Sequence, residues 1–190
     1  MPGPARTLVI SLALLALAGC GGKDDGNSTS SAQSAGAKDG VNSKTIAAGL
    51  PQNGRFMTAA KVAGLDQTLA GHDSYTVLVP DDAAFDKLPA GTLGDLAKPE
   101  ARAQATGLLT YHILPGVVLA DDIGKAIDNS KGKAVLATMG GGTLTAERDG
   151  GKIVLTDGKG QRATIGQADD KYSNGVVHHI DAVLSPPERR

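Results

Sequence analysis

The stretch YTVLVPDDAAFDKL, residues 75–88, decides how this chain folds. Its first half is mostly β-branched and apolar on both faces, which favours a strand covered on both sides over an alternating edge strand. Pro80 has no N–H to donate to a strand ladder, so the strand ends there. Asp81 or Asp82 is then placed to cap a short helix that turns Phe85 inward. The sequence therefore predicts a buried strand that leads directly into a helix.

Two later stretches bring the chain back to this strand. Residues 108–118, LLTYHILPGVV, predict a strand at 111–114 that ends at a Pro-Gly turn. Residues 174–187, NGVVHHIDAVLSPP, predict closing strands at 175–181 and 182–184 before two prolines stop them.

Together, these three stretches resemble the two conserved blocks and the intervening Tyr-His motif of the fasciclin (FAS1) domain. The resemblance places that domain at residues 41–187 and implies the FAS1 fold, in which two strand layers form a wedge with helices packed on one side and edge. Periodicity alone indicates only the α+β class. The residues that match the family pattern, and to which we assign a structural role, are Thr76, Pro80, Phe85, Tyr111, His112, Gly175, His178 and Asp181.

Helix caps, apolar spacing and turn residues predict the other elements. Asn42 or Ser43 caps a first helix, and Gly64 closes a second one at residues 55–63. A further helix begins at Pro99 and ends at Leu109. Additional caps are expected at Thr92 and at Asp121 or Asp122. Short alternating strands joined by hairpin turns are predicted at residues 135–138, 143–147, 152–156 and 163–167.

The amino terminus has the pattern of a lipoprotein signal. The apolar run after Arg6 is too short to span a bilayer permanently, which indicates a signal peptide at residues 1–19. It ends in LAGC, which resembles the bacterial lipobox and implies acylation of Cys20 and a stable lipid anchor. Residues 20–40 lack large apolar side chains and predict a flexible tether, and residues 188–190 form a tail. The alternative is a plain secretory signal with a chance cysteine.

Composition excludes several kinds of partner. The net charge of −1 offers no electrostatic footprint for nucleic acid. Trp is absent and aromatic residues make up 3% of the chain, which argues against a face built for stacking. Cys20 is the only cysteine, so no intramolecular disulfide forms. The length suits one ordinary domain that is stable as a monomer or associates weakly.

The sequence contains no catalytic motif, and neither a cofactor nor a metal is expected. It lacks a G-x-S-x-G elbow, a Walker loop and an H-E-x-x-H pair. His178 and His179 are adjacent on one predicted strand, so they point to opposite faces and do not bind one metal ion. We interpret His112 and His178 as buried imidazoles that pin two segments together by hydrogen bonds, with a ligand or catalytic role as the alternative. Asp181 is interpreted as a turn or backbone cap.

Tyr111 and two acidic pairs are interpreted structurally as well. Tyr111 lies among apolar residues, which favours core packing. The pairs Asp81-Asp82 and Asp169-Asp170 are sequence neighbours that face different ways, so neither forms a matched acid and base. We expect all four carboxylates to serve as caps or turn residues.

A tethered module without a catalytic motif predicts a non-enzymatic protein of the bacterial cell envelope. The family resemblance implies adhesion or matrix binding, with an extracellular protein or polysaccharide as partner and the membrane contacted through the lipid anchor. In a Gram-negative host the anchor favours the outer membrane or the periplasmic side, and exposure at the cell surface fits too. Two alternatives remain: a periplasmic protein that binds a small molecule between helices and sheet, and an enzyme with His112 or His178 as base.

Overall fold

The computed structural model describes residues 43–88 and 98–187 of the chain. The predicted signal peptide, Cys20, the tether and the tail at 188–190 lie outside these ranges, as do the expected caps at Asn42 and Thr92. Within the described ranges, no helix is both long and apolar enough to cross a membrane.

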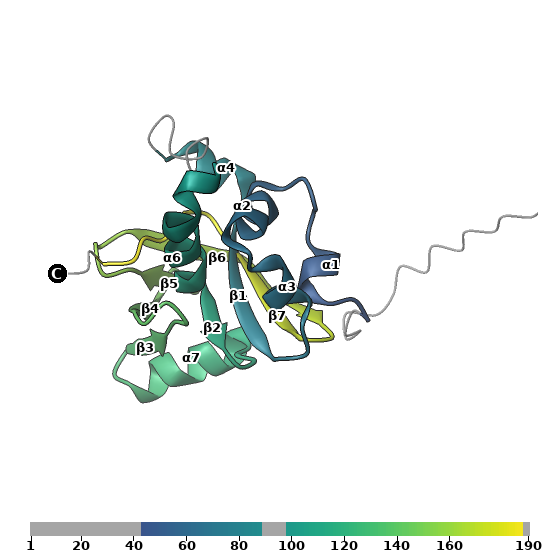
Figure 1. Ribbon diagram of the computed structural model, residues 1–190. Helices are drawn as coiled ribbons and strands as arrows, with labels where there is room; N and C mark the ends of the chain where they lie inside the picture. The colour runs from purple at the N-terminus through teal and green to yellow at the C-terminus, as the bar shows by residue number, and fades with distance from the viewer. Residues whose placement is uncertain (1–42, 89–97, 188–190) are drawn as a thin grey trace, which may run out of the picture. The chain divides into compact units, whose positions relative to one another are not determined.

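Seven strands of the described ranges form one sheet in the order β2-β1-β7-β6-β5-β4-β3 (Figure 1). They are β1 (Tyr75–Pro80), β2 (Ile113–Pro115), β3 (Lys133–Ala137), β4 (Thr143–Asp149), β5 (Lys152–Thr156), β6 (Arg162–Tyr172) and β7 (Gly175–Ile180). β1 and β7 are parallel, and the other neighbouring pairs are antiparallel. β6 pairs first with β5 and then with β7, and its register shifts twice along β7. Such irregularities bend a strand, so the sheet turns at β6 into the two layers of a wedge.

The helices pack against this sheet in two places (Figure 1). Residues of α1, α2, α3, α4 and α6 share one hydrophobic cluster with β1 and β7, whereas α7 packs with β3–β6 in a second cluster. The helices are α1 (Ile46–Gly49), α2 (Arg55–Ala63), α3 (Asp66–Ala70), α4 (Asp82–Asp86), α6 (Arg102–Tyr111) and α7 (Ala120–Asn129), and a 3₁₀ turn at Pro99–Ala101 leads into α6.

β1 lies between the two clusters, and all six of its residues are buried. Val77 and Val79 point into the first cluster, which we call the helix-covered cluster. Leu78 points into the second, which we call the cluster between the layers. Successive side chains of a strand face opposite sides, so a strand buried on both faces needs an unbroken apolar run. The predicted strand covered on both sides is therefore confirmed, and so is the α+β class.

Several predicted boundaries are confirmed. α2 spans the expected residues 55–63, and Gly64 ends it with φ at 75°, the left-handed conformation that glycine adopts readily. The turn between β4 and β5 contains Gly150 and Gly151, both with positive φ.

The end of β6 differs from the prediction. β6 continues to Tyr172, well past the predicted end at residue 167, because its second half pairs with β7.

The expected capping of α4 by an acidic side chain is wrong. Asp81 is the N-cap residue, but its carboxylate accepts no capping hydrogen bond. Asp82 accepts a hydrogen bond from the backbone N–H of Arg55 at 3.3 Å, and the Arg55 side chain donates to the Asp82 carbonyl at 3.2 Å. Asp82 therefore ties the start of α4 to the start of α2.

The first helix is capped by Thr45, which corrects the expectation of Asn42 or Ser43. Thr45 Oγ1 accepts from the N–H of Ala48 at 3.4 Å. The first free amide of the helix, that of Ile46, donates to Asn174 Oδ1 at 2.8 Å. A distant side chain thus completes the capping, and this partner cannot be seen in the local sequence.

Two predicted strand segments take other conformations. α6 extends through Tyr111, so the strand begins only at Ile113. The segment 182–184 forms no strand, because its backbone is held by side chains: the N–H of Leu184 donates to His112 Nε2 at 3.1 Å, and the N–H of Ser185 donates to Asp157 Oδ2 at 2.8 Å. Backbone groups satisfied in this way have no need of a ladder partner.

Candidate functional site

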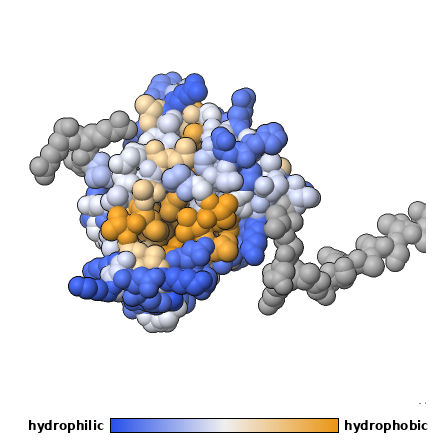
Figure 2. Space-filling view, turned by 90° about the horizontal axis from the view of Figure 1, so that it is seen from below, coloured by the Kyte–Doolittle hydropathy of each residue, from blue (hydrophilic) through white to orange (hydrophobic). Residues whose placement is uncertain are grey.

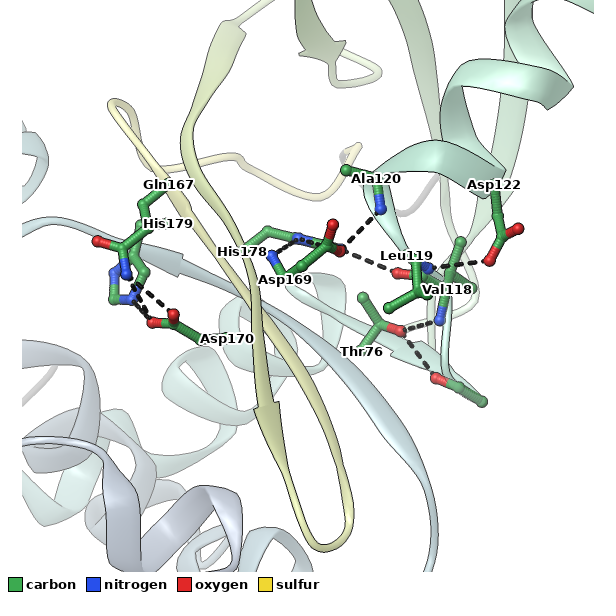
Figure 3. A network of polar contacts seen from close by, with 11 residues as sticks. Thr76, Val118, Leu119, Ala120, Asp122, Gln167, Asp169, Asp170, His178 and His179 are labelled. Carbon is green, nitrogen blue, oxygen red and sulfur yellow. Dashed lines mark hydrogen bonds and ion pairs between the residues drawn. The ribbon is translucent and has the colours of Figure 1, made fainter. Parts of the chain in front are cut away.

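Thr76 fastens the loop after β2 to the central strand (Figure 3). Its side chain is fully buried, and Oγ1 donates to the carbonyl of Gly116 at 2.8 Å. The same oxygen accepts from the N–H of Val118, also at 2.8 Å. One hydroxyl therefore satisfies two backbone groups of a loop that has no strand partner there.

His178 of β7 joins the same loop to β6 (Figure 3). Its ring is buried; Nε2 lies 2.9 Å from the carbonyl of Val118, and Nδ1 accepts from the N–H of Asp169 at 3.1 Å. A carbonyl only accepts and an amide N–H only donates, so the ring is neutral with its proton on Nε2. Burial lowers the pKa of His178 in agreement with this state. Asp169, at a φ of 63°, accepts from the N–H of Ala120 at 2.9 Å and so caps α7.

His112 has the same character at the end of α6. It is buried, its Nδ1–H donates to the carbonyl of Leu108 at 2.9 Å, and Nε2 accepts from the N–H of Leu184. Burial lowers its pKa to about 4, so the ring is neutral at physiological pH. A neutral ring with both nitrogens engaged holds the C-terminal segment against α6.

Tyr111 is the largest fully buried side chain of the described ranges. Its hydroxyl donates to the carbonyl of Thr143 at 2.8 Å and accepts from the N–H of Gly158 at 3.3 Å. Burial raises the pKa of the phenol. The ring packs in the cluster between the layers, where its polar end joins two hairpins.

Other residues singled out in the sequence have structural surroundings. Pro80 ends β1, and Phe85 is buried in the helix-covered cluster. Gly175 has a φ of 145°, and a Cβ there would lie 2.0 Å from the carbonyl oxygen of Tyr75. Two backbones approach at this point too closely for any side chain.

Asp181 lies beside β6 and caps backbone groups. Its carboxylate accepts from the N–H of Thr164 at 2.7 Å, and its own N–H donates to the Thr164 carbonyl at 3.2 Å. The first interaction is a backbone cap, in which a short acidic side chain substitutes for a ladder partner, and the second is a backbone–backbone hydrogen bond.

His179 points to the opposite side of β7 from His178 (Figure 3) and is partly exposed. Its Nε2 lies 3.1 Å from Asp170 Oδ2, and its Nδ1 lies 3.6 Å from Asp81 Oδ1. The side chain of Gln167 donates to both oxygens of Asp170, at 2.9 and 3.0 Å. The adjacent histidines therefore have different surroundings: His178 is enclosed by backbone groups, and His179 lies between two carboxylates near the surface.

Two polar residues that sequence reasoning missed are as important as the histidines. Asn174 donates to the carbonyls of Leu69 and Gly71 while its oxygen caps α1, so it joins β7 to two helices. Asp157 accepts from the N–H groups of two residues in its own turn, and from the C-terminal segment. The Asp-Gly and Asn-Gly pairs were visible as turn signals, but the distant partners were not.

The described ranges contain no cluster of three or more His, Cys, Asp or Glu side chains that would hold a metal ion. In the same ranges, no buried side-chain nitrogen or oxygen lacks a hydrogen-bond partner. The buried polar groups are therefore used for structure. The surface differs: Figure 2 shows a continuous hydrophobic patch bordered by hydrophilic side chains.

Comparison with known proteins gives concordant matches. The fasciclin domain model matches residues 51–186. Protein sll1483 of Synechocystis sp. is 35% identical over 142 residues, which cover 75% of this chain and 72% of that protein. The transforming growth factor-beta-induced protein ig-h3 of Sus scrofa is 35% identical over 129 residues, which cover 67% of this chain and 17% of the relative.

A solved structure has a similar fold. It is a FAS1 domain pair from the insect cell adhesion molecule Fasciclin I, with a TM-score of 0.65 and 18% sequence identity. The match covers 75% of this chain and 51% of that one, so the chain spans about half of the domain pair.

Proposed function

Because the chain belongs to the fasciclin family, we propose that it is a lipid-anchored, non-enzymatic protein of the bacterial cell envelope that mediates adhesion. Its partner is an extracellular protein or polysaccharide. Adhesion is proposed because the FAS1 domain pair with a similar fold belongs to an insect cell adhesion molecule.

The observation that carries this proposal is the exposed apolar surface (Figure 2). Large contiguous apolar patches on soluble proteins mark interaction sites, whereas single scattered apolar side chains are normal on a surface. In the described ranges the exposed large apolar side chains are Val117, Val135 and Met139, at 51%, 69% and 42% exposure. Val135 lies on β3, the last strand in the sheet order.

The use of the polar residues supports a role without catalysis. A general base needs a nitrogen or carboxylate that can reach a substrate. Both ring nitrogens of His112 and of His178 are engaged with backbone groups, and both rings are buried. The two histidines considered as bases in the enzyme alternative therefore have no nitrogen left for a substrate.

The lipid anchor rests on the sequence of the amino terminus. An apolar run followed by LAGC supports acylation of Cys20, and the polar residues after it suit a tether between membrane and domain.

Attachment of cells to protein-coated and polysaccharide-coated surfaces tests the proposal. We expect wild-type cells to attach, and cells whose chain keeps Cys20 and the tether but lacks residues 43–187 to lose attachment. Val135→Ser should weaken attachment without loss of folded protein, because the side chain is largely exposed. Gln67→Ser, an exposed substitution on α3, is the matched control. Equal attachment by wild type and the deletion would refute the adhesive function.

A further inference from the structure

A cavity of about 200 Å³ opens at the corner between the end of β1 and the start of α2. We call it the β1–α2 cavity; its apolar wall includes Leu50, Phe56, Met57 and Val79. Its polar rim includes Asp81 and His179. The buried histidines His112 and His178 do not line it.

The cavity has the size for a small ligand with an apolar body. Apolar cavities of about 150 Å³ are known to take up benzene-sized molecules. Ligand sites are typically apolar pockets with a few polar groups that fix orientation. The β1–α2 cavity has this composition, with side chains from the α1–α2 connection, β1 and β7 forming its walls.

At the rim, a ring nitrogen of His179 lies beside the carboxylate of Asp81. His179 Nε2 lies 3.1 Å from Asp170 Oδ2, so Nδ1 is the ring nitrogen next to Asp81 at the rim. Asp81 Oδ1 lies 3.6 Å from Nδ1, too far for a direct hydrogen bond and close enough for one ligand group to contact both. A ligand group that donates hydrogen bonds suits this position, because the Asp81 carboxylate only accepts them.

The charged side chains at the rim favour a positively charged ligand. The guanidinium of Arg55 is paired with Asp86 and donates to the carbonyl of Asp82, so its charge is already matched. The carboxylates of Asp81 and Asp170 flank His179. A primary ammonium supplies three N–H donors and a positive charge, which complements this rim.

We propose that the β1–α2 cavity binds a small apolar compound with a primary amine head, with the amine between His179 and Asp81. The apolar body lies against Met57 and Val79. This activity goes beyond adhesion and does not depend on it, because the cavity and the exposed apolar side chains of the adhesion proposal involve different residues. The proposal names a class of ligand, small apolar amines, for the small-molecule binding that the sequence analysis keeps as an alternative function.

Methyl NMR on the full chain carrying Cys20→Ser, which prevents acylation, tests the proposal. The chain has three methionines, of which Met57 lines the cavity and Met139 lies exposed elsewhere. Benzylamine, benzyl alcohol and benzoate are titrated as probes of similar size. We expect a saturable shift of the Met57 methyl and none of Met139, with benzylamine binding about two- to fivefold more tightly than benzyl alcohol and benzoate weakest.

Asp81→Asn isolates the role of the carboxylate. The Asp81 side chain makes no capping hydrogen bond, so the variant should fold as the wild type does. We expect it to bind benzylamine and benzyl alcohol equally. Asp121→Asn, which removes an exposed carboxylate paired with Lys125 on α7, is the control and should keep the amine preference. An unshifted Met57, equal binding of all three probes by the wild type, or an amine preference that survives Asp81→Asn would each overturn the proposal.

Discussion

The buried, neutral His112 should make the fold sensitive to acid. Its folded pKa is about 4, against an ordinary value of 6.5, because burial opposes the charged form. Between these two pH values the unfolded chain binds a proton that the folded chain does not, so stability falls as pH falls. From pH 7 to pH 5 the linkage amounts to about 2 kcal/mol for this residue alone. The lowered pKa of His178 adds a loss in the same direction.

Replacement of the ring separates this effect from general acid sensitivity. His112→Gln keeps a polar side chain that cannot titrate, and we expect it to lower the free energy of unfolding at pH 7 by about 1–3 kcal/mol through imperfect hydrogen bonds. Between pH 7 and pH 5, however, it should lose about 2 kcal/mol less than the wild type does. Urea unfolding followed by circular dichroism at several pH values measures both quantities.

A second variant provides the control for lower stability as such. Ile127→Val removes one buried methyl group from the cluster between the layers, costs about 1 kcal/mol, and leaves both buried histidines in place. It should follow the wild-type pH dependence with a constant offset. If His112→Gln instead runs parallel to the wild type from pH 7 to pH 5, the account of His112 as a buried neutral ring is wrong.

Three further substitutions test other parts of the structure. Gly175→Ala should lower the free energy of unfolding by about 3 kcal/mol or more, because its Cβ would meet the Tyr75 carbonyl oxygen at 2.0 Å. Gly116→Ala, which has open space at a φ of 81°, should lower it by about 1 kcal/mol. Equal losses of the two variants in urea unfolding would contradict this. Tyr111→Phe removes a hydroxyl bonded to two backbone groups and should lower stability by about 1–2 kcal/mol by the same assay, and an unchanged midpoint would exclude a structural role for that hydroxyl. Cys20→Ser should move the protein from the membrane fraction to the soluble fraction, and persistent membrane association would refute the lipid anchor.

The parts of the fold that sequence predicted depend on local patterns. β1 was predictable because its apolar run has no polar face, and Pro80 marks its end in the sequence itself. The end of α2 was predictable for the same reason, since Gly64 adopts positive φ at no steric cost. In both cases the residue that determines the boundary lies at the boundary.

The failed predictions have distant partners in common. Tyr111 was assigned to a strand, but its hydroxyl reaches hairpins more than thirty residues along the chain, and α6 continues so that the ring enters the cluster between the layers. The segment 182–184 has strand-like composition, yet the side chains of His112 and Asp157 bind the amides at its end. Sequence pattern carries no information about a side chain that substitutes for a ladder partner from so far away.

The adjacent histidines show how the buried link at His178 and the amine site at His179 depend on one structural detail, the register of β6 against β7. Strand periodicity alone places His178 and His179 on opposite faces, and it assigns neither face to the interior. The assignment comes from β6, whose shifted register brings Asp169 to the ring of His178 and Asp170 to the ring of His179. Asp169 offers its backbone N–H and Asp170 its carboxylate, so one ring becomes a buried neutral link and the other lies beside Asp81 at the rim of the β1–α2 cavity. A variant that removed the irregularity in β6 should therefore weaken both the acid-sensitive wedge and the amine site, although their residues do not overlap.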